Sequence, residues 1–407
     1  MWLALLVVPG FIAIDAARHY EPTDFRCFYT AARMVQQQRD PYDPVSWSEA
    51  IGPGPARDGA GVVRPSSCPG RFAYPLWTAL VLVPLAYLPI ATAATIWMLA
   101  LVAGVAFGSV RLWHAAVPEP RSPLVFAALV FTSQPLWFTL EVAQFGGLML
   151  GLIGLTLWLA SKRHALAGLP LALLVLKPHV TFLTIGAMCI WLTRHVRGAA
   201  VLAGTLGLAL VVTSIAIRPN WIAGWLVEIG GPERLANTAS HTTVWHLAPL
   251  LGLPAWTAVF LIAPLLVLLV RELTRSKGLV IDVVAVSGVC GLLVSPYQGS
   301  YDQLILVAAW GRALAIGLAR TGLIRAGLLV GVVAAASLLP WTLRAIALQS
   351  RQDETPNAIA LVATAAVLCA ALRATRRAAE ASVARSRLAA GARKSRPAVG
   401  SGDSVVA

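Results

Sequence analysis

The sequence has very few charged residues for its length. Of 407 residues, 12% are Asp, Glu, Lys or Arg and 58% are hydrophobic, whereas a soluble domain carries about 25% charged residues. The apolar residues form long runs, and a helix needs about 20 of them to cross a membrane. Backbone groups in lipid must pair internally, which leaves helices or a closed barrel. Because the runs do not alternate in twos, the sequence predicts an all-α, polytopic integral membrane helical bundle.

Sequence signatures of nucleotide binding and of common hydrolases are missing too. There is no Gly-rich phosphate loop with Lys and Ser or Thr, no H-E-x-x-H and no G-x-S-x-G. The five cysteines and the acidic residues show no metal-ligand spacing. The sequence therefore indicates no cofactor and gives no support for a divalent metal. An enzyme of this design needs an activated donor delivered from the membrane, and a lipid-linked phosphate sugar fits that need.

The net charge of +14 is concentrated at the ends of apolar runs, which argues for membrane orientation and against a nucleic-acid partner. Cytoplasmic loops carry the excess of Lys and Arg. Residues 76–88, between Pro75 and Pro89, are too few to cross comfortably, so we expect a re-entrant or interfacial helix there. This layout gives about 12 transmembrane helices in a bacterial cytoplasmic (inner) membrane, with both chain ends on the cytoplasmic side. If 76–88 does cross, every later turn is inverted.

The chain divides into a membrane-embedded domain, residues 1–372, and a basic cytoplasmic tail, residues 373–407, expected to be disordered. We expect residues 2–17 to be a retained first span, with a cleaved signal peptide as the alternative. A long first extracytoplasmic loop, 18–75, follows. It contains Cys27 and Cys68, which form either a disulfide or two unrelated thiols.

This topology gathers the unusual polar residues on the outer side of the membrane. Polar groups at membrane depth are costly and usually line a cavity or a site, so their convergence predicts a site facing outward. The members are Asp24, Glu141, Gln144, Lys177, His179, His241, His246, Tyr297, Tyr301 and Asp302. Lys177 and His179 are candidates for holding a phosphate, and Gln144, Tyr301 and Asp302 for holding a sugar.

Structural explanations stay open for several of these residues. Asp24 is also a favoured N-cap for a helix over 25–38. Lys177, next to Pro178, also fits a turn whose lysine reaches the membrane interface. Asp302 also fits a helix start, where a carboxylate meets the positive dipole end. Glu141 and Gln144, three residues apart, also fit a capped turn. His241 and His246 are five apart and share a helical face poorly, so one of them is expected to be structural.

Five short motifs, in this order, resemble the polytopic glycosyltransferases of family 87, which have the GT-C membrane fold. They are DFRCFYTAARMVQQQRDPYD (24–43), FAYPLWTALVLVPLAYLP (72–89), AQFGGLMLGLIGLTLWLASKR (143–163), LAGLPLALLVLKPH (166–179) and SPYQGSYDQLIL (295–306). The resemblance implies transfer of a hexose, typically mannose, from a polyprenyl-phosphate-sugar to a glycolipid or polysaccharide outside the cytoplasm. Substrates and membrane lipids are then the expected partners.

The resemblance also implies roles for particular residues. Asp24 matches the family's general base, and His241 is the nearest match to a histidine in a late outer loop. Motif-supporting positions are Phe25, Tyr29, Tyr42, Tyr74 and Glu141. We expect an inverting single displacement. The competing hypotheses are a lipid or lipid-linked-sugar flippase without transferase activity, and a non-catalytic assembly subunit that binds lipid.

Overall fold

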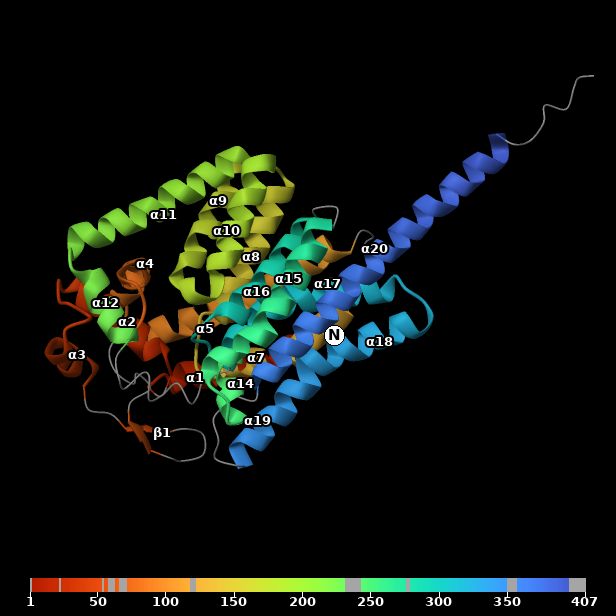
Figure 1. The fold of residues 1–407 in the computed structure, drawn as a ribbon. Helices are drawn as coiled ribbons and strands as arrows, with labels where there is room; N and C mark the ends of the chain where they lie inside the picture. The colour runs from red at the N-terminus through yellow and green to blue at the C-terminus, as the bar shows by residue number, and fades with distance from the viewer. Residues whose placement is uncertain are drawn as a thin grey trace, which may run out of the picture.

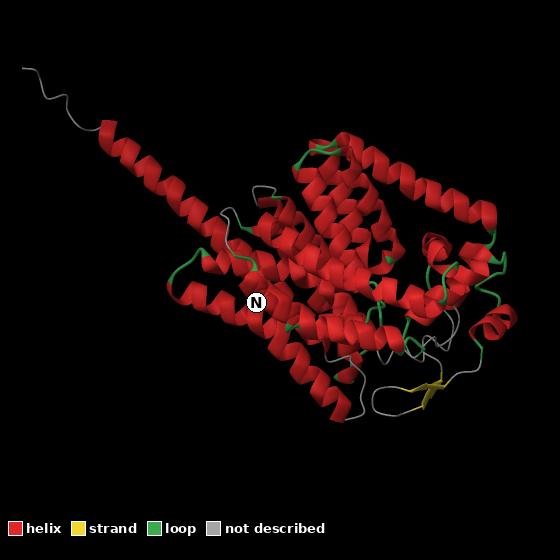
Figure 2. Ribbon diagram, turned by 180° about the vertical axis from the view of Figure 1, so that it is seen from behind, coloured by secondary structure: helices red, strands yellow, loops and turns green. Residues whose placement is uncertain are grey.

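The computed structural model describes nearly all of the chain and confirms an all-α membrane fold (Figure 1). A small antiparallel hairpin, β1 (Pro55–Arg57) with β2 (Val63–Pro65), is the strand structure seen in the described residues (Figure 2). The described residues are 2–21, 23–52, 55–57, 63–65, 72–117, 122–230, 243–275, 279–349 and 357–394.

The first half of the chain forms one long helix, α5, among many shorter ones. The helices are α1 (Trp2–Arg18), α2 (Phe25–Gln36), α3 (Pro44–Ile51), α4 (Leu76–Ala86), α5 (Ile90–Ala116), α6 (Leu124–Phe131), α7 (Gln134–Glu141), α8 (Gly146–Ser161), η1 (Ala165–Ala167), α9 (Gly168–Leu173), η2 (Leu174–Leu176) and α10 (Pro178–His195).

The second half contains longer helices and ends on α20, which projects away from the bundle in Figure 1. The elements are α11 (Arg197–Ile217), α12 (Trp221–Ile229), α14 (Val244–Leu250), η4 (Ala255–Ala258), α15 (Val259–Arg275), α16 (Val280–Val294), η5 (Ser300–Leu306), α17 (Val307–Leu318), α18 (Gly322–Val333), the π-helical turn η6 (Ala334–Leu338), α19 (Leu339–Gln349) and α20 (Ala358–Lys394).

The prediction of about 12 spans is not confirmed. In the described residues, five helices are long and apolar enough to cross a membrane, or six if a bent pair counts as one. That pair, α6 and α7, meets at 56° within the predicted span 122–140. The break falls at Ser133, and Pro135 is the second residue of α7, because proline suits the first turn of a helix and not its interior. The predicted interfacial piece 76–88 is the short helix α4.

Close packing of α5 against α8 fixes the position of α8. A Cβ on Gly104 would lie 2.4 Å from the Gly147 carbonyl oxygen, and one on Gly151 would lie 2.7 Å from Gly104 Cα. Small residues spaced by four let membrane helices approach this closely. The contact therefore holds the N-terminus of α8, and the turn before it, in one register against α5.

Two expectations about the chain ends and the cysteines can be judged. The tail is not disordered from residue 373, since α20 continues to Lys394. Its sequence is rich in Ala and Arg, which favour helix, and Arg373 and Arg376 both bond to the buried Glu272. Cys27 is disulfide-bonded, and its predicted partner Cys68 lies outside the described residues.

Candidate active site

Lys177 lies at a break between two helices, where side chains of α4 bond to the carbonyl groups that the break leaves unpaired. The residue directly follows η2 and precedes Pro178, the first residue of α10. A break leaves carbonyl groups without helical partners. Here Trp77 Nε1 donates to the Val175 carbonyl at 2.9 Å, and Thr78 Oγ1 donates to that of Leu176 at 3.0 Å. The lysine side chain is 1% exposed, so it does not reach the interface, and the snorkelling explanation is wrong.

Gln144 is positioned by a left-handed turn between α7 and α8. Ala143 has φ 55°, its N–H bonds to the Leu140 carbonyl at 3.2 Å, and the Gln144 N–H bonds to that of Thr139 at 2.9 Å. This pair of bonds is the Schellman helix end, which usually has Gly at the left-handed position. Trp97 Nε1 holds the Ala143 carbonyl at 2.8 Å. The glutamine therefore projects from a rigid turn.

Asp24 is bound to the same turn, and its side chain does not cap α2. The Asp24 N–H donates to the Val142 carbonyl at 3.0 Å, and the carboxylate makes no capping hydrogen bond to the helix. Gln144 Nε2 donates to Asp24 Oδ2 instead. The capping explanation is therefore wrong for the side chain, which is partly exposed. Asp43 shows the contrast, because it accepts from the Ser46 N–H at 2.8 Å and caps α3.

Asp302 brings a second carboxylate to Lys177. Its Oδ1 lies 2.5 Å from Lys177 Nζ, and its Oδ2 accepts from the Gly299 N–H at 3.1 Å. It therefore serves both as a helix-start residue and as an ion-pair partner. The ring of Tyr301 lies under the ammonium group, 4.4 Å from Nζ to the ring centroid, which is within the range of a cation–π contact.

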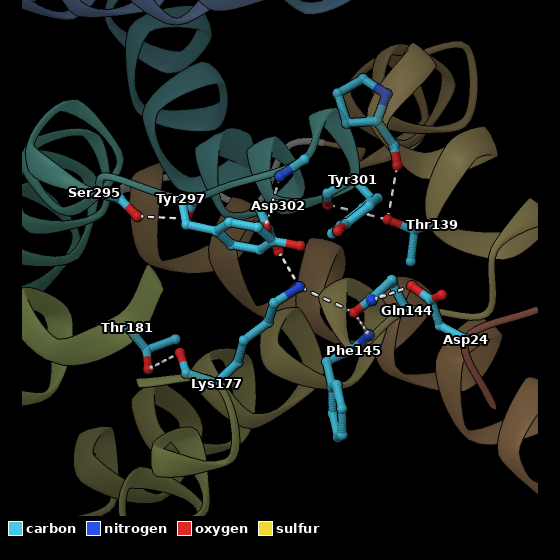
Figure 3. A network of polar contacts seen from close by, with 12 residues as sticks. Asp24, Thr139, Gln144, Phe145, Lys177, Thr181, Ser295, Tyr297, Tyr301 and Asp302 are labelled. Carbon is cyan, nitrogen blue, oxygen red and sulfur yellow. Dashed lines mark hydrogen bonds and ion pairs between the residues drawn. The ribbon is translucent and has the colours of Figure 1, made fainter. Parts of the chain in front are cut away.

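These side chains form one continuous polar chain (Figure 3). Lys177 Nζ donates to Gln144 Oε1 at 2.9 Å, and Gln144 Nε2 donates to Asp24. Since an ammonium can only donate, it fixes which end of the amide faces it. The order is Asp302, Lys177, Gln144, Asp24, which we call the polar relay. It runs from a buried ion pair to a partly exposed carboxylate.

An aromatic wall surrounds the Gln144 end of the polar relay. Phe28 packs against Phe145 and Tyr74 with centroids 4.5 and 5.2 Å apart. Tyr74 Oη is 3.3 Å from Gln144 Oε1 and 3.2 Å from its Nε2. Burial, and next the Asp24 carboxylate, raise the pKa of Tyr74 well above its usual value, so it keeps its proton. Tyr42 Oη donates to the Tyr74 carbonyl at 2.6 Å, which helps to fix the position of Tyr74.

Other predicted residues lie further out or outside the described chain. His179 packs edge-on against Tyr297, with centroids 5.7 Å apart, and Figure 3 shows Tyr297 beside Asp302. Glu141 is exposed and pairs with Arg344 at 3.0 Å. His241 lies outside the described residues, while His246 bonds to Thr243 at 2.6 Å. The described residues hold no group of three or more His, Cys, Asp and Glu side chains suited to a metal ion.

Two motif-supporting residues anchor α2. Tyr29 Oη donates to the Leu88 carbonyl at 2.7 Å, and Phe25 stacks on Trp97 at 5.9 Å. Asp24 therefore directly precedes a helix whose first turns are fixed in position.

The comparison with family models matches residues 72–296 to "Glycosyltransferase family 87". The chain belongs to glycosyltransferase family 87. It is therefore a membrane glycosyltransferase. The matched range contains Tyr74, Gln144 and Lys177, whereas Asp24 precedes it and Asp302 follows it. No curated protein and no solved structure matches the chain.

The sequence alone did not identify Gln134 as a member of a site. Tyr297, by contrast, was predicted from the SPYQGSYD turn. Gln134 stands in an apolar run, and the Ser133 and Pro135 that flank it mark the helix break that exposes it to a pocket.

Proposed function

We propose that this family 87 enzyme transfers a hexose, with mannose the first choice, from a polyprenyl-phosphate-sugar to a glycolipid or polysaccharide on the extracytoplasmic face. The polar relay carries the proposal. Glycosyl transfer from a phosphate requires a base for the acceptor hydroxyl and positive charge for the leaving phosphate, and the relay ends in a carboxylate and contains an ammonium.

In the proposed step, Asp24 accepts the proton of the acceptor hydroxyl while that oxygen attacks the anomeric carbon. The bond from this carbon to the phosphate oxygen breaks, and polyprenyl phosphate leaves with the electron pair. One displacement inverts the anomeric centre. Gln144 holds Asp24 Oδ2, so the carboxylate keeps one orientation before the acceptor arrives.

Lys177 supplies positive charge for the departing phosphate. Its three donors are already directed, toward Asp302, Gln144 and the face of Tyr301. A charge held in this way needs little reorganisation during the reaction. The phosphate takes over part of the contact that Asp302 makes with Lys177. The hydroxyl groups of Tyr74 and Tyr297, and the His179 ring, line the same region and are the candidates for contacts to the sugar.

The test uses the purified full-length chain in liposomes containing radiolabelled polyprenyl-phosphate-mannose and a lipid extract as the acceptor source. We expect label to move into a glycolipid or polysaccharide fraction, and NMR of the product to show an inverted anomeric centre. Label that crosses the bilayer without entering a product would support the flippase hypothesis instead. A retained anomeric configuration would overturn the single displacement.

A further inference from the structure

A cavity separate from the polar relay is lined by Phe138, whose ring packs on Tyr301. Its volume is about 260 Å³, and it lies between α7 and α19, with α1 contributing Ile12. The other lining residues are Gln134, Trp137, Phe138, Glu141, Trp341 and Arg344. We call it the α7–α19 pocket. It contains no member of the polar relay.

Three of the seven lining residues are aromatic. Trp137 and Trp341 are 6.4 Å apart and inclined at 62°, and the Arg344 guanidinium lies 4.3 Å above the Phe138 ring. The indole of Trp341 is fixed in place, because its Nε1 donates to the Thr132 carbonyl at 2.8 Å. A π-helical turn, Ala334–Leu338, directly precedes α19, and such turns are frequent at functional sites.

One buried polar group in this pocket has an unpaired end. Gln134 is 1% exposed, its Nε2 donates to Ser300 Oγ at 3.2 Å, and its Oε1 has no hydrogen-bond partner. Turning the amide over would leave the nitrogen unpaired instead, so one end lacks a partner either way. Buried polar groups are normally bonded, so a hydrogen-bonding ligand is favoured beside Gln134 over a purely apolar one.

The pocket is also lined by a charged pair and lies close to the polar relay. The Glu141–Arg344 ion pair, 3.0 Å from Nη2 to Oε2, provides an acceptor and a planar donor at the rim. Phe138 packs on Tyr301 with centroids 5.5 Å apart, and Glu141, the last residue of α7, lies three residues before Gln144. The helix that lines the pocket therefore leads directly into the turn that carries Gln144.

We propose that the α7–α19 pocket is a carbohydrate subsite that holds a sugar ring of the acceptor, away from the ring that reacts. A pyranose has apolar C–H faces that pack against indole rings and hydroxyls around its edge that bond to amide, carboxylate and guanidinium groups. An isoprenoid chain would pack against the rings of Trp137, Phe138 and Trp341 but would leave the Gln134 amide unpaired. That the bound sugar belongs to the acceptor rests on the proposed function, whereas the binding of a sugar to this pocket does not.

The test measures sugar binding without transfer. The full-length chain in nanodiscs of neutral lipid is titrated with methyl α-mannopyranoside, glucopyranoside and galactopyranoside, and Kd is read by saturation-transfer NMR. We expect at least one of these to bind, and Trp341→Ala and Gln134→Leu each to raise Kd at least fivefold. Trp341→Phe should recover part of the affinity because it restores an aromatic face. Trp256→Ala, an exposed tryptophan on η4, is the matched control and should change nothing.

Unchanged Kd in Trp341→Ala would overturn the subsite, as would mapping of a photoreactive farnesyl probe onto α19. Trp341 is exposed, so its truncation tests the proposal even if Gln134→Leu fails to fold. If the proposed function is wrong and the subsite is right, the protein will bind sugar in a way that depends on Trp341 but will show no transferase activity. Transfer with an acceptor KM unaffected by Trp341→Ala would overturn the subsite alone.

Discussion

Two buried ion pairs in this molecule differ in where their hydrogen bonds lead. Arg312 binds Asp282 through Nε at 2.5 Å and Nη2 at 3.4 Å, and its Nη1 donates to the Ala116 carbonyl at 3.4 Å. These contacts join α5, α16 and α17 and end there. Lys177 also binds a buried carboxylate, but its next contact is Gln144, which leads on to the partly exposed Asp24.

Burial of a charged pair therefore does not by itself distinguish a functional site from a structural contact. Buried ion pairs contribute little to stability on balance, because desolvation offsets the attraction. Such a pair can be retained for structure or for chemistry. The Arg312–Asp282 pair closes on itself and on a backbone carbonyl, which fits a structural tie. The Lys177–Asp302 pair opens toward the surface through a side-chain amide, which fits a reaction centre.

The largest effect should come from Asp24→Asn. The asparagine oxygen can still accept from Gln144, so we expect normal expression, an unchanged melting temperature and donor binding. Removing the base should lower turnover about 10²–10⁴-fold, measured by radiolabelled transfer. Asp282→Asn is the contrast, because it should lower the melting temperature while each folded molecule stays active. Wild-type turnover in Asp24→Asn would remove Asp24 from the mechanism.

Next in size is a matched break of the two ion pairs. Lys177→Met and Arg312→Met each leave a buried carboxylate unpaired and should destabilise the protein by about 3–5 kcal/mol, seen as a lower melting temperature. Adding Asp302→Asn or Asp282→Asn, respectively, should restore most of that loss.

The two double variants should then differ in activity. The Arg312→Met/Asp282→Asn protein should regain transfer, and the Lys177→Met/Asp302→Asn protein should be folded and inactive, because it lacks the cation for the leaving phosphate. If both doubles are active, the comparison between a structural and a functional pair fails.

The sequence predicted the outer polar cluster through topology rather than through local pattern. Asp24, Gln144, Lys177 and Asp302 are far apart in the chain, and the excess of arginine in alternate turns assigned them to one side. The structure brings these four together. Local patterns gave competing explanations for Asp24 and Lys177, because capping and snorkelling depend on where a side chain points, which spacing cannot decide.

Features made by tertiary packing were not predictable in this way. The α7–α19 pocket joins Gln134 to Trp341, and neither belongs to a short motif. The count of spans failed for a related reason, because apolar length does not report breaks such as the one at Ser133. The tail was predicted from its charge, but α20 continues to Lys394 and its arginines pair with Glu272.

The smallest effect should come from the two left-handed turns at the ends of α8. Ala143 has φ 55° and Arg163 has φ 53°, and each closes a Schellman helix end. Non-glycine residues are strained in this conformation, so Ala143→Gly and Arg163→Gly should each stabilise the protein by up to about 1 kcal/mol in thermal unfolding. A β-branched residue should be worse than the native one at both positions.

Activity then separates the two turns. Ala143→Val should shift Gln144, whose backbone N–H bonds to Thr139 across this turn, and lower turnover in the molecules that fold. Arg163→Val distorts an equivalent turn that has no contact with the polar relay, and should leave turnover per folded molecule unchanged. Because both substitutions strain the backbone in the same way, any difference in turnover measures how far the orientation of Gln144 controls Asp24. Equal turnover in the two variants would mean that the relay tolerates movement of its central amide.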